Sequence, residues 1–198
     1  MADGARSDGR SRGPCDLRPY SHGCPGGKTA HHVVPDHCFK QPGENKDYWP
    51  GAVPHSDGAC ICVDGATKST GKDGGYITKQ AYGKGKQFDE AAHFNALADH
   101  GKIHALLDRS ERQLGNKGDP KNTSSLGAME KAGADSVAKV TGCDAENLQS
   151  QVREHHDSSY GMKEDYKVRA DPTGKKGDVD FSKMGPSAKG SVGSGRAM

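Results

Sequence analysis

The sequence contains few large apolar residues. Of its 198 residues, 24 are Leu, Ile, Val or Phe, about 12% of the chain, which is below the roughly 20% at which compositions begin to look disordered. It also lacks a large excess of one charge, because 28 Lys and Arg stand against 26 Asp and Glu, so it does not have the composition of a self-repelling coil. We therefore expect a small hydrophobic core surrounded by long loops.

Long hydrophobic runs are absent as well. No stretch approaches the roughly 18 apolar residues of a membrane-spanning helix, and no apolar segment of a secretory signal follows Met1. These two absences argue against a membrane protein and against export by the general secretory route.

The six cysteines show no CxxC spacing, so a zinc ribbon is not indicated. In a chain without an export signal we expect them mainly as reduced, buried thiols. One or two disulfides, or a minor zinc site that uses Cys24 and Cys38, are the alternatives.

Turn-forming and apolar residues divide the chain into four parts. These are a flexible arm (1–13), a core (14–115), an accessory helical part of the same domain (116–170) and a flexible tail (171–198). The expected elements are strands over 29–34 and 59–63, a helix over 88–114 that could divide at Gly101, a polar loop over 116–125, and helices over 126–139 and 145–156, the last capped by Asp144. The expected class is α+β, with the order strand, strand, helix in the core.

The histidines fall into two pairs within this order. His31 and His32 are neighbours on a strand, so their side chains point to opposite faces, and one can face a metal while the other faces the substrate. His100 and His104 lie four residues apart on one helix face, which suits two imidazoles that bind one transition-metal ion. His93 could add a ligand. Each pair alone is more typical of solvated surface, but together they favour a site.

Around these histidines the sequence resembles nuclease toxins of the HNH/endonuclease VII superfamily. Residues 29–39, TAHHVVPDHCF, are similar to the opening of the group named for a Gly-His-His signature, with Ala30 in place of the glycine. Residues 17–20, 24–27, 60–65 and 100–104 share the likeness, which covers about residues 17–110.

The resemblance implies a small ββα-metal (His-Me finger) core and a metal-dependent, nonspecific DNA endonuclease. It implies that His32 is the general base and that His31, His100 and His104 hold one divalent ion. An asparagine would orient the base, for which Asn95 is the first choice and Asn45 the competitor.

Such toxins are commonly effectors of type VI secretion. They pass without a signal peptide into the cytoplasm of a target cell and are neutralised by a cognate immunity protein, which we expect to be acidic here.

Lysines near these motifs could contact the phosphate backbone. Lys28 precedes the first strand, and Lys84 and Lys86 lie in a Gly-rich loop that also carries Lys68, Lys72 and Lys79. Such contacts bind without sequence specificity and weaken with salt. Imidazole ligands favour Zn²⁺, Ni²⁺ or Cu²⁺ by affinity, while Mg²⁺ or Mn²⁺ could be the working ion.

Two other functions fit the same residues. The histidines and cysteines could be structural staples of a non-enzymatic zinc-binding module, or the same fold could act on RNA.

The remaining histidines carry weaker signals. His37 and Cys38 could help a structural metal, and Asp36 is interpreted as a turn residue. His155 and His156 near a helix end fit a dipole interaction, and His55 belongs to no pattern.

Overall fold

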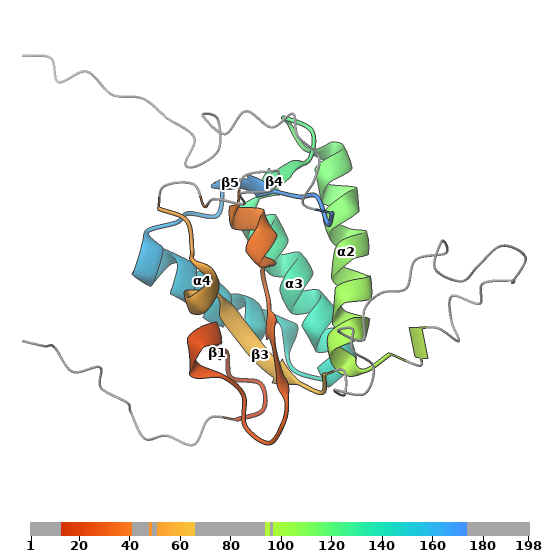
Figure 1. Ribbon diagram of the computed structural model, residues 1–198. Coiled ribbons are helices and arrows are strands. Elements are labelled where there is room, and N and C mark those ends of the chain that lie inside the picture. Colours follow the sequence, from red (N-terminus) through yellow and green to blue (C-terminus); the bar gives the residue numbers. More distant parts are fainter. Residues whose placement is uncertain (1–12, 41–47, 49–50, 66–93, 96, 174–198) are drawn as a thin grey trace, which may run out of the picture.

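The computed structural model describes residues 13–40, 48, 51–65, 94–95 and 97–173 (Figure 1). The elements in chain order are β1 (Arg18–Pro19), β2 (Thr29–His32), β3 (Ala59–Val63), α2 (Asp99–Lys117), β4 (Thr123–Ser125), α3 (Leu126–Thr141), α4 (Ala145–Tyr160) and β5 (Lys167–Arg169). Short 3-10 helices occupy Tyr20–His22 (η1), Asp36–Phe39 (η2) and His55–Asp57 (η3). Three helices and small antiparallel sheets among these residues are compatible with the expected α+β class.

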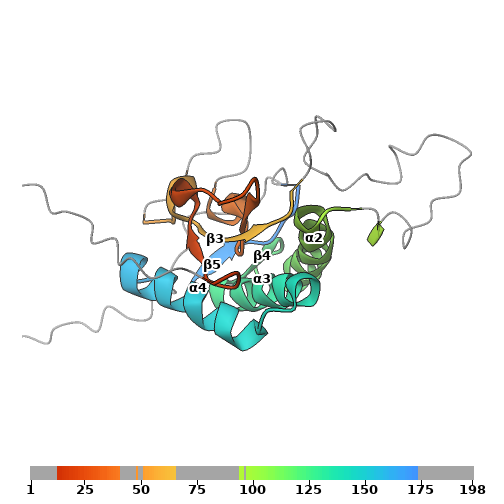
Figure 2. The ribbon, with the colours of Figure 1, turned by 90° about the horizontal axis from the view of Figure 1, so that it is seen from below.

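The larger sheet has the order β1-β3-β2, with both pairings antiparallel. The register places His31 opposite Ile61 and His32 opposite Cys60. The strand predicted over 59–63 is confirmed, whereas β2 ends at His32, two residues earlier than predicted, because Pro35 begins the turn into η2. In Figure 2 this sheet lies on one side of the molecule and α3 and α4 lie on the other.

A second sheet pairs β4 with β5 and was not expected from the sequence. The three residues of β4, Thr123–Ser125, fall in the stretch predicted as a polar loop. Their backbone pairs with residues more than forty positions later, so the strand depends on tertiary structure rather than on a local pattern.

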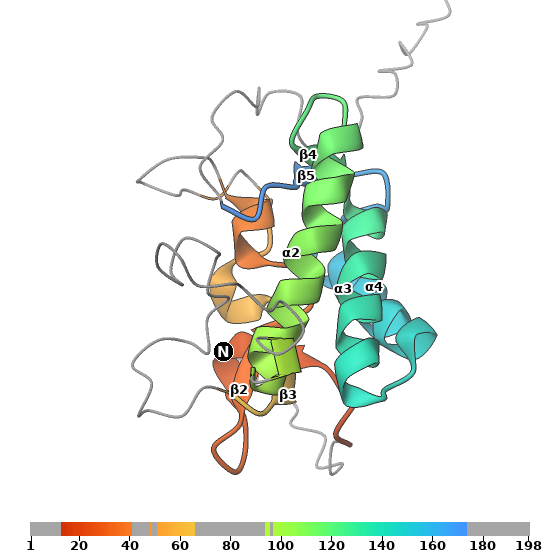
Figure 3. The same ribbon diagram turned by 90° about the vertical axis from the view of Figure 1, so that its right-hand side faces the viewer.

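The helix predicted over 88–114 is interrupted within its described part, where Phe94 and Asn95 are helical but separate from α2. α2 begins at Asp99, because Ala98 has extended backbone angles of φ −66° and ψ 165°. Gly101 lies inside α2 and does not divide it, and residues 88–93 lie outside the described part of the chain. Figure 3 shows β2 and β3 beside the first turns of α2.

The two later helices are confirmed. α3 and α4 run slightly beyond their predicted ends, and each stops at a left-handed glycine, Gly142 and Gly161. The predicted cap at Asp144 is present, since its carboxylate accepts a hydrogen bond from the Asn147 backbone N–H at 2.7 Å. None of the described helices is long and apolar enough to cross a membrane.

The buried apolar residues form one cluster that joins the sheet to all three helices. Its fully buried members include Ile61 from β3, Ile103 and Leu107 from α2, Met129 from α3 and Leu148 from α4. Because the cluster takes residues from both sides of position 115, the predicted core and the predicted accessory part share their packing. The boundaries of the four predicted parts remain predictions.

α3 lies against the end of β2 at a glycine. A Cβ built at Gly133 would lie 2.0 Å from the backbone oxygen of Val33, so only glycine permits this approach. We expect Gly133→Ala to destabilise the fold by about 1–3 kcal/mol, the usual cost of an overpacked core.

Denaturant unfolding measures the effect of Gly133→Ala, with Gly127→Ala in the same helix as the control. At Gly127 a Cβ would meet only side-chain atoms of Glu164 closer than 3.5 Å, the nearest at 3.1 Å, and alanine gains up to about 1 kcal/mol of helix propensity over glycine. Equal stability of the two variants would contradict the close approach.

Four of the six cysteines form disulfides, so the expectation of reduced thiols is wrong for them. Cys15 is bonded to Cys143 and Cys24 to Cys62. The alternative zinc site with Cys24 is therefore excluded, and Cys38 and Cys60 are buried free thiols.

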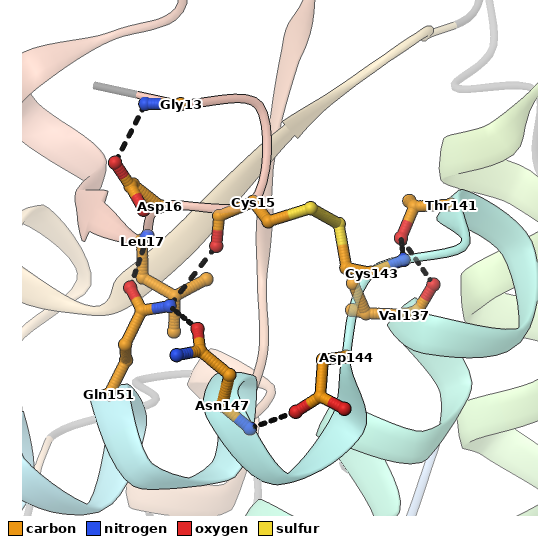
Figure 4. Close-up of a disulfide and its surroundings, with 10 residues drawn as sticks. All are labelled: Gly13, Cys15, Asp16, Leu17, Val137, Thr141, Cys143, Asp144, Asn147 and Gln151. Atoms are coloured by element: carbon orange, nitrogen blue, oxygen red, sulfur yellow. Dashed lines mark hydrogen bonds between the residues drawn. A yellow bond between two sulfur atoms is a disulfide. The ribbon is translucent and has the colours of Figure 1, made fainter. Parts of the chain in front are cut away.

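The Cys15–Cys143 bridge fastens the start of the described chain to the turn between α3 and α4 (Figure 4). Gln151 of α4 strengthens the attachment, because its side chain accepts a hydrogen bond from the Leu17 N–H at 2.8 Å and donates one to the Cys15 carbonyl at 3.2 Å.

Candidate metal centre

His31 of β2 is the buried centre of a group of three histidines. Its side chain is inaccessible apart from 2% of its surface. Neither ring nitrogen has a hydrogen-bond partner among the described residues, which is costly for a buried polar group. Burial, then the nearby His104 and His100, hold the pKa of His31 well below its usual value. The imidazole is thus neutral, which is the form that binds a metal.

His100 and His104 of α2 face His31 from one side of the helix. Their ring centroids lie 5.0 and 4.5 Å from that of His31 and 4.7 Å from each other. The first turn of α2 is fixed to the end of β3, because the His100 backbone N–H donates to the Asp64 carbonyl at 2.9 Å. In this way β2, β3 and α2 bring together histidines that are more than 65 positions apart in the sequence.

These three histidines could hold a metal ion. Each offers one ring nitrogen, and the three nitrogens lie within 4.8 Å of one another. Binding would satisfy a nitrogen of His31 that otherwise lacks a partner. Three imidazoles leave room for a further ligand, as in catalytic rather than closed structural zinc sites. The predicted ligand set is therefore assembled in space.

His32 points away from His31, as expected for its neighbour on a strand. Its Nε2 lies 3.1 Å from the backbone oxygen of His55. Since a carbonyl can only accept, Nε2 carries the proton, and Nδ1 of the neutral ring is left as an acceptor. The ring stacks on Tyr20, with centroids 5.0 Å apart and planes 11° from parallel. Burial lowers the pKa of His32, although the bond to His55 opposes this.

A pocket of about 210 Å³ connects His32 with the candidate metal ligands. Its lining consists of Ala30, His32, Pro35, Asp36, His37, His100 and His104. A group bound there could contact both the two α2 histidines and His32. A larger pocket of about 280 Å³ lies between β1 and α4, but its lining includes only His155 among the histidines. Of these two pockets, the smaller one therefore contains the side chains that could bind a metal or accept a proton.

The contacts that His32 makes with its neighbours were not predicted from the sequence. His55 supplies the carbonyl that holds the His32 ring, and its Nδ1 lies 3.6 Å from a carboxylate oxygen of Asp36. Asp36 begins η2, as a turn residue would, and also accepts hydrogen bonds from Lys40 and Tyr48. Burial raises the pKa of Asp36, but these two bonds outweigh it and leave the pKa lowered. No spacing in the sequence could have indicated a contact made by a backbone carbonyl.

The other predicted site residues lie apart from this group or outside the described chain. Asn95 is exposed, and its role toward His32 remains a prediction. Lys28 is exposed directly before β2. Lys84, Lys86, Asn45 and His93 lie outside the described residues.

Of the two histidines near the end of α4, His156 belongs to the core, whereas His155 is half-buried and lines the 280 Å³ pocket. His156 is buried, and its Nδ1 lies 2.6 Å from a carboxylate oxygen of Glu130 in α3. Arg153 pairs with the same carboxylate at 3.0 Å. Glu130, His156 and Arg153 thus link α3 to α4, and the dipole interaction predicted for His155 and His156 remains a prediction.

Comparisons with protein-family models, with curated proteins and with solved structures gave no match.

Proposed function

We propose that this protein is a metal-dependent, nonspecific DNA endonuclease that acts as an antibacterial toxin, with β2, β3 and α2 as a ββα-metal core. One observation carries the proposal. A buried His31, whose two ring nitrogens have no hydrogen-bond partner in the described part of the chain, faces the His100 and His104 pair. The next residue, His32, lines the same pocket as that pair.

Hydrolysis of a phosphodiester requires an activated water, relief of negative charge in the transition state and a stabilised leaving oxygen. A divalent ion on His31, His100 and His104 would supply Lewis acidity toward the phosphate and the leaving oxygen. By affinity such a site prefers Zn²⁺ or Ni²⁺, and Mg²⁺ or Mn²⁺ are the other candidates.

His32 is the proposed general base. Its Nε2–H bond to His55 fixes the ring and the tautomer, so that Nδ1 is the nitrogen that accepts the proton from water. Stacking on Tyr20 restricts the ring further. A base held in one orientation contributes more to the rate than a mobile one, because the geometry is arranged before the reaction.

The exposed Lys28 beside β2 is the described residue best placed to meet a phosphate backbone, with Lys84 and Lys86 proposed to assist. The toxin proposal also includes delivery by a contact-dependent system into the target-cell cytoplasm. It further includes a cognate immunity protein whose acidic surface would cover the site or the lysines.

Cleavage assays of plasmid DNA and of ribosomal RNA test this function. The oxidised chain is incubated with each polymer in Mg²⁺, Mn²⁺, Ni²⁺ or Zn²⁺, beside His104→Ala and, as a matched control, His155→Ala. We expect DNA cleavage that is lost in His104→Ala, kept in His155→Ala and weakened by salt. Cleavage of RNA alone would mean that the same site acts on RNA rather than on DNA. A folded chain that cuts neither polymer in any metal would overturn the proposal in favour of a structural role.

Gly58 controls the position of the proposed base. A Cβ at this residue would lie 2.3 Å from Cδ2 and 2.7 Å from Nε2 of His32, so Gly58→Ala must displace the imidazole. We expect a rate loss of about 10²-fold, typical of a misplacement of about 1 Å, with metal affinity unchanged.

Plasmid cleavage and metal titration of Gly58→Ala are compared with Gly13→Ala, where a Cβ would make only ordinary contacts. An unchanged rate of plasmid cleavage in Gly58→Ala would show that His32 does not take part in the reaction.

A further inference from the structure

A second group of metal-binding side chains lies further along α2. It consists of His37 and Cys38 from η2 and Glu111 from α2, each of which offers one ligand atom, and these atoms lie within 4.8 Å of one another. His37 Nε2 and a carboxylate oxygen of Glu111 are 2.7 Å apart. Cys38 and Glu111 are wholly buried, while His37 is about one third exposed and also lines the 210 Å³ pocket.

The Glu111 carboxyl group is only partly satisfied by its described surroundings. Its side chain is 0% exposed, and its second oxygen has no hydrogen-bond partner within the described parts of the chain. A buried carboxylate in this state is costly unless a cation or further donors satisfy it.

Asp108, one helical turn earlier, adds to the negative charge. Burial and then the Glu111 charge raise the pKa of Asp108 to about 6. Arg169 contributes positive charge near Cys38, but its guanidinium hydrogen-bonds Asp171 at 3.3 Å and the Lys40 carbonyl at 3.1 Å. Among the described residues the second oxygen of Glu111 therefore still lacks a partner, which a cation could supply.

We propose that His37, Cys38 and Glu111 bind a zinc ion at a site distinct from the His31 centre. Sulfur, imidazole nitrogen and carboxylate oxygen are the three donor types that zinc takes in proteins. The bound ion would take Cys38 as the thiolate, with its proton released to solvent. It would also satisfy the unpartnered oxygen of Glu111.

The position of this site suggests what it does. Glu111 follows His104 by seven residues, which is about 10 Å along a helix, so the two sites are separate. A zinc ion there would fasten the segment after β2 to the middle of α2. The strand directly before this segment carries His31, and α2 carries His100 and His104. The inference does not depend on nuclease activity.

Cobalt spectroscopy tests the site without any assay of activity. In the full, oxidised chain carrying His100→Ala and His104→Ala, the first site is removed while His37, Cys38 and Glu111 are intact. We expect one equivalent of Co²⁺ to bind with a near-ultraviolet thiolate-to-cobalt charge-transfer band and the visible absorption of tetrahedral cobalt. Zinc should displace it.

Further variants assign the ligands. Adding Cys38→Ser should abolish the charge-transfer band, and Cys60→Ser, at the other buried free thiol, should leave it unchanged. Glu111→Gln should weaken cobalt binding about tenfold or more, as loss of a ligand or its support does.

The proposal is overturned if the folded double variant saturated with Co²⁺ shows no thiolate band, or if the band persists in Cys38→Ser. Circular dichroism establishes folding in each case. If Cys38→Ser does not fold, the double variant with Cys38 in place still decides the matter by its spectrum.

Discussion

His32→Ala is expected to reduce DNA cleavage by about 10²–10⁴-fold, the range of a lost general base, while the chain still folds and binds its metal. The separation arises because His31 and His32 leave β2 on opposite faces. The His31 ring faces His100 and His104, whereas the His32 ring bonds the His55 carbonyl and stacks on Tyr20. Removal of His32 therefore takes away a proton acceptor and leaves the three candidate ligands in place.

The measurement pairs initial rates of plasmid nicking with metal titration of the same preparation. His22→Ala, at an exposed histidine in η1, is the matched control and should retain the wild-type rate. A His32→Ala protein that cuts at the wild-type rate would require another base. One that loses its metal as well would make His32 a ligand.

Loss of the Cys15–Cys143 disulfide is expected to lower the free energy of unfolding more than any of the other substitutions. The bridge spans 128 residues, and the chain-entropy model gives about 5 kcal/mol for a loop of this length at 25 °C. Domains of this size have only about 5–15 kcal/mol of stability in total. The core is also poor in large side chains, so the bridge supplies a large share of what holds the N-terminal segment to α4.

Denaturant unfolding of Cys15→Ser/Cys143→Ser measures this effect without reductant. The matched comparison is Cys24→Ser/Cys62→Ser, whose loop of 38 residues gives a smaller value of about 4 kcal/mol in the same model. Thiol titration of the unfolded, unreduced wild type should find two reactive thiols, Cys38 and Cys60. Six reactive thiols, or an unchanged unfolding midpoint in both variants, would contradict the disulfides.

Local patterns indicated the two histidine pairs, and the resemblance to HNH nucleases then implied which of these histidines would bind the metal. His31 and His32 are neighbours on a strand, so their side chains face opposite sides. His100 and His104 lie four residues apart on a helix, so their side chains share one face. Both patterns act over a few residues. The structure adds that the ends of β3 and α2 are joined through Asp64 and His100, which brings the two pairs to the same place.

What the sequence did not reveal depends on contacts between distant residues. The Cys15–Cys143 pair has no local signature, and β4 exists only through its pairing with β5. The contribution of His55 to the site is a backbone carbonyl, which any residue can supply. The apolar spacing that predicted a helix from residue 88 carried no sign of the extended backbone at Ala98.

The most direct test of the central claim is the rate of plasmid cleavage by the chelator-stripped chain as metal is added back, beside His100→Ala. We expect no cleavage by the stripped chain, recovery on addition of a divalent ion, and recovery in His100→Ala only at much higher metal concentration. Undiminished cleavage by the stripped chain in excess EDTA would contradict a catalytic metal at His31, His100 and His104.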